Sequence, residues 1–157
     1  MTTTFAFSDL EPNYQYLLQE ADEAMDMAYA PYSGFTVGAA LLAEDGQVIT
    51  GSNVESASYG GTICAERSAL LRANALAMRK FKAIAVIAKG KNADTVEVTS
   101  PCGICRQLLF EFSQISGIDM DVIMSNTKMD KIIVAKISEL LPMGFGPKDL
   151  GIDVTKY

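Results

Sequence analysis

The sequence contains no histidine, and this absence removes several common kinds of active site. Serine–histidine and cysteine–histidine catalytic pairs are excluded, as is every metal site that uses an imidazole ligand. Tryptophan is absent as well, and only three cysteines occur among the 157 residues. Three cysteines are too few, and odd in number, for a disulfide framework. The groups left for chemistry are therefore thiolates, carboxylates and hydroxyls.

Long hydrophobic runs and an excess of positive charge are also missing. No apolar stretch approaches the ~20 residues of a membrane span, and the N-terminal residues lack the basic start of a secretion signal. We therefore expect a cytoplasmic protein with no membrane partner. The net charge of −6 has the wrong sign for holding phosphate backbones, so no nucleic-acid partner is expected. The length favours a single domain over residues 1–157.

Hydrophobic periodicity predicts helices that alternate with strands. Apolar residues recur at helical spacing in four segments, which are residues 12–30, 62–78, 103–116 and 137–141. Short apolar or β-branched runs predict five strands, which are residues 35–43, 47–53, 82–89, 120–125 and 132–135. This order predicts an α/β fold in which helices cover both faces of one sheet.

The three cysteines lie where two of the predicted helices begin. Cys64 is near the start of one helix, and Cys102 and Cys105 form a Cys-x-x-Cys motif at the start of another. Helix N-termini favour thiolate over thiol, and three thiolates can hold zinc while its fourth tetrahedral position stays open. Taken alone, the Cys-x-x-Cys pair could equally be a redox dithiol or half of a structural metal site. A lone Cys64 is more often simply buried.

Glu66 follows Cys64 by two residues, in the first turn of the same predicted helix. In that position its carboxylate could face a metal-activated water without binding the metal, and could carry protons to a substrate and its leaving group. First-turn glutamates are also common because the helix dipole favours them. The functional interpretation of Glu66 therefore depends on the neighbouring cysteines.

At these residues the sequence resembles the cytidine deaminases. Residues 62–67 and 100–107 are similar to the two zinc motifs of that family, and Cys64 stands where some relatives carry histidine. Other segments are similar to the substrate-binding and C-terminal segments of the family, namely residues 31–40, 51–59 and 140–147. The matches occur in order and with family-like spacing.

The resemblance implies a three-layer α-β-α sandwich around a mixed five-stranded sheet, with one Zn²⁺ per subunit. It implies hydrolytic deamination of cytidine and 2′-deoxycytidine to uridine and 2′-deoxyuridine plus ammonia, a reaction of pyrimidine salvage. Cys64, Cys102 and Cys105 would bind the metal, and Glu66 would be the catalytic proton carrier. Arg67 would hydrogen-bond to the sulfurs and offset the negative charge that three thiolates bring to zinc.

The resemblance also assigns residues to a small pyrimidine nucleoside. Phe35 would pack on the pyrimidine ring, and the backbone of Ala65 would meet the edge of the base. Asn53 and Glu55 are two residues apart, so on a strand their side chains face the same way, and they would bind the sugar hydroxyls.

All-cysteine members of about this length are typically homotetramers, so we expect a homotetramer whose active sites are completed by neighbouring subunits. Ala57, Tyr59 and Phe145 match positions that approach a neighbour's site in tetrameric members. Two residues depart from the family pattern, because Ser56 replaces a common asparagine and Gly61 replaces a bulkier residue. We expect the consecutive glycines Gly60 and Gly61 to loosen this loop and widen the pocket for pyrimidines with larger substituents, including N4-substituted cytidines.

Two alternatives stay open at this point. A deaminase of a nucleoside-like antibiotic of the blasticidin S type shares the metal motifs, although Asn53 and Glu55 favour a sugar with hydroxyls. A non-catalytic zinc-binding module would use the cysteines for folding alone. Such a module needs a fourth protein ligand, which the sequence cannot supply from cysteine or histidine, so that Glu66 would have to close the site.

Overall fold

The computed structural model describes residues 3–157, whose strands form one mixed sheet. In chain order the strands are β1 (Thr3–Phe5), β2 (Thr36–Ala43), β3 (Val48–Ser52), β4 (Phe81–Lys89), β5 (Asp121–Ser125) and β6 (Ile132–Lys136). Their order across the sheet is β1-β6-β5-β4-β2-β3. The pair β4–β5 is parallel, and the other four neighbouring pairs are antiparallel.

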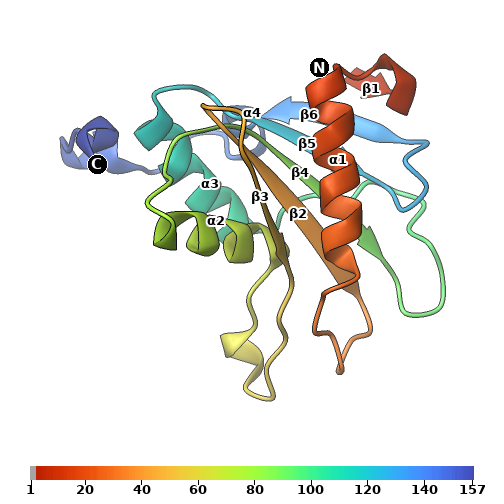
Figure 1. Cartoon of the computed structure of the whole chain (residues 1–157). Coiled ribbons are helices and arrows are strands. Elements are labelled where there is room, and N and C mark those ends of the chain that lie inside the picture. The colour runs from red at the N-terminus through yellow and green to blue at the C-terminus, as the bar shows by residue number, and fades with distance from the viewer. Residues whose placement is uncertain (1–2) are drawn as a thin grey trace.

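Helices cover both faces of this sheet, which confirms the predicted three-layer arrangement (Figure 1). They are α1 (Pro12–Met25), α2 (Ala65–Ala75), α3 (Gly103–Ser116) and α4 (Ile137–Leu140). Helix α1 lies on one face, and α2 and α3 lie side by side on the other (Figure 1). No helix within residues 3–157 combines the length and the apolar character that crossing a bilayer requires.

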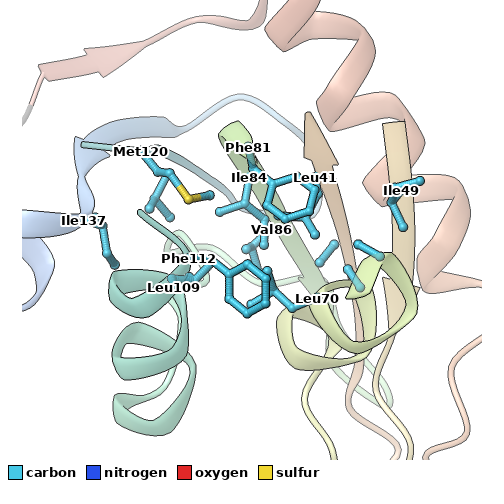
Figure 2. Close-up of a cluster of buried hydrophobic side chains, with 14 of the residues drawn as sticks. Leu41, Ile49, Leu70, Phe81, Ile84, Val86, Leu109, Phe112, Met120 and Ile137 are labelled. Carbon is cyan, nitrogen blue, oxygen red and sulfur yellow. The ribbon is translucent and has the colours of Figure 1, made fainter. Parts of the chain in front are cut away.

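Two apolar clusters fill the spaces between the layers. One lies between the sheet and the helices α2 and α3, where Leu70 and Phe112 are buried (Figure 2). The other lies under α1, where Leu17 is buried. Alternate residues of β4 contribute to the two clusters, with Ile84 and Val86 in the first and Ala85 and Ile87 in the second. The continuous apolar run of β4 is therefore explained by burial on both faces.

The prediction of five strands was wrong, because β1 adds a sixth strand at the edge of the sheet. Thr3 pairs with Val134 of β6, and Phe5 pairs with Ile132. Three residues are too few to show an alternating pattern, and pairing with an existing strand, rather than local propensity, forms this element.

The first helix ends at Met25 instead of near residue 30, because the chain there pairs with a distant segment. The N–H of Tyr29 donates to the carbonyl of Asn53 at 3.0 Å, and the N–H of Glu55 donates to the carbonyl of Tyr29 at 2.8 Å. The segments that precede β2 and follow β3 are thereby held together where both extend beyond the sheet (Figure 1).

The second helix is also shorter than predicted at both ends. Ile63 forms an antiparallel bridge with Val54, so residues 62–64 stay extended and α2 begins at Ala65. At the other end Ala77 adopts a φ of 60°, which stops the helix after Ala75. Because the chain is extended up to residue 64, the cysteine at that position precedes the helix instead of lying within it.

The contact between α2 and β3 leaves no room for a side chain at Gly51. A Cβ atom there would lie 2.3 Å from the backbone nitrogen of Ala69 and 2.7 Å from the carbonyl oxygen of Ala65. We expect Gly51→Ala to lower the free energy of unfolding by about 1–3 kcal/mol, since α2 must move away from the sheet. Urea denaturation measures this change. The control is Gly60→Ala, whose Cβ would meet nothing within 4 Å; equal stability of the two variants would contradict the predicted overpacking.

Candidate active site

The three cysteines converge, as predicted, at the N-terminal ends of α2 and α3. Cys64 is the N-cap of α2, Cys102 is the N-cap of α3, and Cys105 lies in the first turn of α3. The Sγ atoms of Cys64 and Cys102 are 3.7 Å apart, those of Cys102 and Cys105 are 3.4 Å apart, and all three lie within 4.8 Å of one another. Sulfurs bound ~2.3 Å from a tetrahedral zinc lie about 3.8 Å apart. The cluster therefore has the dimensions of a three-thiolate zinc site.

The electrostatics of the cluster favour a bound cation. A hydrogen bond from Cys105, helped by others from Cys102 and Arg67, lowers the pKa of Cys64 to about 5, although burial opposes the shift. The interaction with Cys64 and burial raise the pKa of Cys105, because a second thiolate would lie beside the first. A divalent cation removes this repulsion and allows all three sulfurs to ionise. The two helix starts, neither of which has a side-chain cap, add positive potential.

Arg67 brings a fixed positive charge to the same place. Its Nη2 donates to the carbonyl oxygen of Thr62 at 2.9 Å, and its charge is one of the influences that lower the pKa of Cys64. The Nε atom of Arg67 is buried and has no hydrogen-bond partner within residues 3–157. A buried N–H without an acceptor is costly, and the thiolates of a metal-loaded cluster are suitable acceptors. This orphaned donor fits a site built for zinc.

Glu66 is the buried acid of the site, with 3% of its surface exposed in the first turn of α2. Burial raises the pKa of its carboxyl group to about 7, and the charge of Cys64 acts in the same direction, whereas Cys105 and Arg67 lower it. A hydrogen bond from the backbone N–H of Glu66 itself also lowers this pKa, and the other side chains that act on the carboxyl are members of the cluster and the neighbouring arginine. A carboxyl group with a pKa near 7 can both accept and donate a proton at neutral pH.

Asn53, predicted to bind the sugar, is buried and already hydrogen-bonded at both ends of its amide. The Oδ1 atom accepts a hydrogen bond from the N–H of Val37 at 2.8 Å, and Nδ2 donates to the carbonyl oxygen of Phe35 at 2.9 Å. The side chain of Asn53 therefore holds the backbone at the start of β2. Phe35, predicted to pack on the base, is 38% exposed at this point.

Glu55 is held by the turn that precedes β2. Its carboxylate accepts hydrogen bonds from the N–H groups of Tyr32 at 2.8 Å and Ser33 at 3.2 Å, and from the hydroxyl of Ser33. The hydroxyl contact is the main cause that lowers the pKa of Glu55. A pocket of about 350 Å³ opens here, lined by Tyr32, Ser33, Glu55, Tyr59 and Thr62. The sequence did not single out Tyr32, Ser33 and Thr62, although they belong to the segments that carry the resemblance.

The other predicted site residues lie in different surroundings. Ala65 is buried at the first position of α2, and Ala57 is exposed. The rings of Tyr59 and Phe145 are 76% and 60% exposed, so both are available to another molecule. Phe145 lies in the C-terminal segment, where Gln107 of α3 donates to its carbonyl oxygen at 2.7 Å.

Comparison with known proteins places the chain among zinc enzymes. Residues 11–119 match the family model described as the cytidine and deoxycytidylate deaminase zinc-binding region. The chain is 46% identical over 134 residues to a cytidine deaminase of Sporosarcina psychrophila, which covers 85% of this chain and 92% of that protein. It is also 46% identical over 136 residues to a cytidine deaminase of Halalkalibacterium halodurans, with 87% and 96% of the two chains covered.

Solved structures agree with these sequence relationships. A cytidine deaminase from Burkholderia pseudomallei superimposes with a TM-score of 0.75 at 42% identity, covering 84% of this chain and 98% of the other. The cytidine deaminase of Mycobacterium tuberculosis gives a TM-score of 0.68 at 33% identity, covering 87% of this chain and 99% of the other. With its three-cysteine cluster in place, the chain belongs to the zinc-binding cytidine and deoxycytidylate deaminase family.

Proposed function

We infer that this chain is a zinc-dependent cytidine deaminase that hydrolyses cytidine and 2′-deoxycytidine to uridine and 2′-deoxyuridine with release of ammonia. The observation that carries this conclusion is the cluster of three sulfurs at two helix starts with a buried acid, Glu66, beside it. When bound, zinc supplies a Lewis acid that lowers the pKa of a water molecule toward neutrality.

Residues of this chain would bind the metal, transfer the protons and balance the charge of the site. Cys64, Cys102 and Cys105 would hold the metal by three bonds and leave a fourth position open. Glu66 would accept one proton from the attacking water and donate it to N3 of the pyrimidine. It would then accept the second proton from the hydroxyl formed at C4 and pass it to the departing amino group. Water thus replaces the amino group at C4, and ammonia carries away the nitrogen. Arg67 would keep the sulfurs from donating too much negative charge to the metal.

We propose that the nucleoside is held between the start of β2 and the end of β3. Phe35 would pack on the pyrimidine ring, and the backbone of Ala65 would meet the edge of the base. Asn53 and Glu55 would bind the sugar hydroxyls, with Glu55 charged and held in place by its hydrogen bonds to the turn before β2. Their contacts with the backbone mean that these groups are already ordered before substrate binds.

The test of this function is turnover of cytidine by the zinc-loaded protein. Conversion to uridine is followed by the change in ultraviolet absorbance, and the released ammonia is measured separately. We expect equal amounts of uridine and ammonia, and little or no reaction with blasticidin S. A zinc-loaded chain that acts on neither cytidine nor 2′-deoxycytidine would overturn the proposal. The antibiotic deaminase and the inert zinc module are not favoured by the family relationship.

We further propose that Gly61, which lies beside Ser56, widens the pocket and so admits N4-substituted cytidines. A Cβ atom at Gly61 would lie 3.5 Å from Oγ and 3.6 Å from Cβ of Ser56, so the two positions adjoin and a larger residue can be introduced at 61 without a backbone clash. We expect Gly61→Leu to lower kcat/KM for N4-methylcytidine about tenfold more than kcat/KM for cytidine. Gly60→Leu, at a position with nothing within 4 Å of its Cβ, is the matched control. Equal losses for both substrates would refute the proposed role of Gly61.

We also propose a homotetramer in which Ala57, Tyr59 and Phe145 reach the active site of a neighbouring subunit. The exposure of the two aromatic rings supports this assembly, because exposed aromatic side chains are enriched at interfaces. Light scattering is expected to give four times the chain mass of 16.9 kDa. A monomer that deaminates cytidine at full rate would rule out shared sites.

The remaining proposals concern the chain as a whole. We infer that residues 1–157 make up one deaminase domain, since the family match spans residues 11–119 and the elements on both sides of that region join the same sheet. We propose a cytoplasmic location, because its reducing conditions preserve three neighbouring free thiols.

A further inference from the structure

Arg106 directly follows the proposed metal ligand Cys105. It forms hydrogen bonds with residues 100–102, the segment that ends at Cys102, the other proposed ligand of the Cys-x-x-Cys motif. Its Nε donates to the carbonyl oxygen of Pro101 at 2.8 Å, and its Nη2 donates to the hydroxyl of Ser100 at 3.3 Å. Its backbone N–H donates to the carbonyl oxygen of Cys102 at 2.9 Å. One residue is therefore hydrogen-bonded to three consecutive positions, the last of which is a ligand.

The same guanidinium group also donates a hydrogen bond to the end of another helix. Its Nη1 donates to the carbonyl oxygen of Leu140, the last residue of α4, at 3.0 Å. Three donors in fixed planar geometry are thus divided between the ligand loop and a neighbouring helix end. A lysine could not copy this arrangement, because its single ammonium group cannot meet three separated acceptors at once.

The ligand that most needs such support is Cys102. Cys105 is buried and lies within α3, so the regular geometry of the helix sets its position. Cys102 is exposed and lies before the helix, with extended backbone angles and no side-chain cap. Its position relative to Cys105 therefore depends on the path of residues 100–102, and that path is what the Arg106 side chain holds.

We propose that Arg106 is a positioning residue for zinc, which fixes the Cys102 sulfur at bonding distance from a metal held by Cys64 and Cys105. It differs from Arg67, whose charge acts on the sulfurs and lowers the pKa of Cys64, because Arg106 acts on the path of the ligand loop through its side-chain hydrogen bonds. Groups that orient metal ligands typically affect metal affinity 10–100-fold. The inference rests on the zinc site of the proposed function and is independent of the substrate.

The experiment compares zinc release from the loaded wild-type protein and from Arg106→Lys and Arg106→Gln, using a chromophoric chelator. We expect release to be about tenfold or more faster for Arg106→Gln and intermediate for Arg106→Lys. The matched control is Arg72→Gln on α2, which loses two hydrogen bonds of Nη1 to Thr50, both 3.1 Å long, away from the ligands. Its release rate should equal that of the wild type.

Cobalt substitution provides a readout that a general loss of stability would not move. The visible absorption of Co²⁺ bound to thiolates reports the coordination geometry, and we expect the bands to change in both Arg106 variants but not in Arg72→Gln. Release rates and cobalt spectra of Arg106→Lys identical to those of the wild type would overturn the proposal. A wild-type chain that binds zinc tightly but leaves cytidine unchanged would refute the proposed function and leave the role of Arg106 standing.

Discussion

Replacing Glu66 by glutamine is expected to reduce kcat for cytidine by about 10²–10⁴-fold while the protein keeps its zinc. The amide has nearly the same shape as the carboxyl group, but it cannot accept the proton of the water or pass it to the substrate. The three sulfurs are untouched by the substitution, so the metal content should stay at one zinc per chain. The measurements are steady-state turnover of cytidine and elemental analysis of the same preparation.

A matched control for this substitution is available on the opposite face of the sheet. Glu23 lies on α1 with an exposed side chain, and Glu23→Gln should leave kcat unchanged. If Glu66→Gln kept more than a tenth of the wild-type kcat, another group would have to carry the protons. If it lost zinc as well as activity, Glu66 would instead contribute to holding the metal, which is the arrangement of an inert site.

The second large effect is expected from removing a ligand. Cys105→Ala should abolish stoichiometric zinc binding and reduce deamination to background, because the buried sulfur is the one placed by the helix itself. Loss of the metal should also destabilise the fold. A ligand present at about 100 times its Kd stabilises the native state by about 2.7 kcal/mol, and tighter sites contribute more.

The stability effect is measured by thermal unfolding with and without a chelator. The wild-type protein should unfold at a lower temperature once the chelator removes zinc, whereas Cys105→Ala should unfold at the same temperature in both conditions. This comparison separates the destabilisation caused by losing zinc from the destabilisation caused by the cavity at residue 105. The variant has the cavity both with and without the chelator, so any effect of the chelator on an unfolding temperature comes from the metal. An unchanged unfolding temperature for the wild-type protein would show that the metal does not support the fold.

The zinc cluster could be predicted because its information is local. Cys64 and the Cys102–Cys105 pair each mark the start of a predicted helix, and the resemblance to the cytidine deaminases implied that these two helix starts bring the sulfurs together. The hydrogen bonds of Asn53 and Glu55 could not be predicted in this way. They join residues about twenty positions apart, and only the folded arrangement shows that the strand-end side chains hold the backbone of Phe35 and the turn before β2.

The fold shows the same division between local and distant causes. Strands with strong apolar patterns, such as β4 and β5, lie where periodicity predicts them, within one residue at each end. Errors arose where pairing between distant segments overrode local preference. Tyr29 leaves the helical path because it pairs with residues 53 and 55, and the three residues of β1 form a strand only through contact with β6.

That sixth strand has a practical consequence for handling the protein. Residues 3–5 cover the outer edge of β6. The β6 residues that pair with them are Ile132, Ile133 and Val134. Truncation at the N-terminus would leave this β-branched edge with unpaired backbone groups, a template on which further molecules can add strand by strand. Shortened versions should therefore aggregate at concentrations that the full chain tolerates, and turbidity would reveal it.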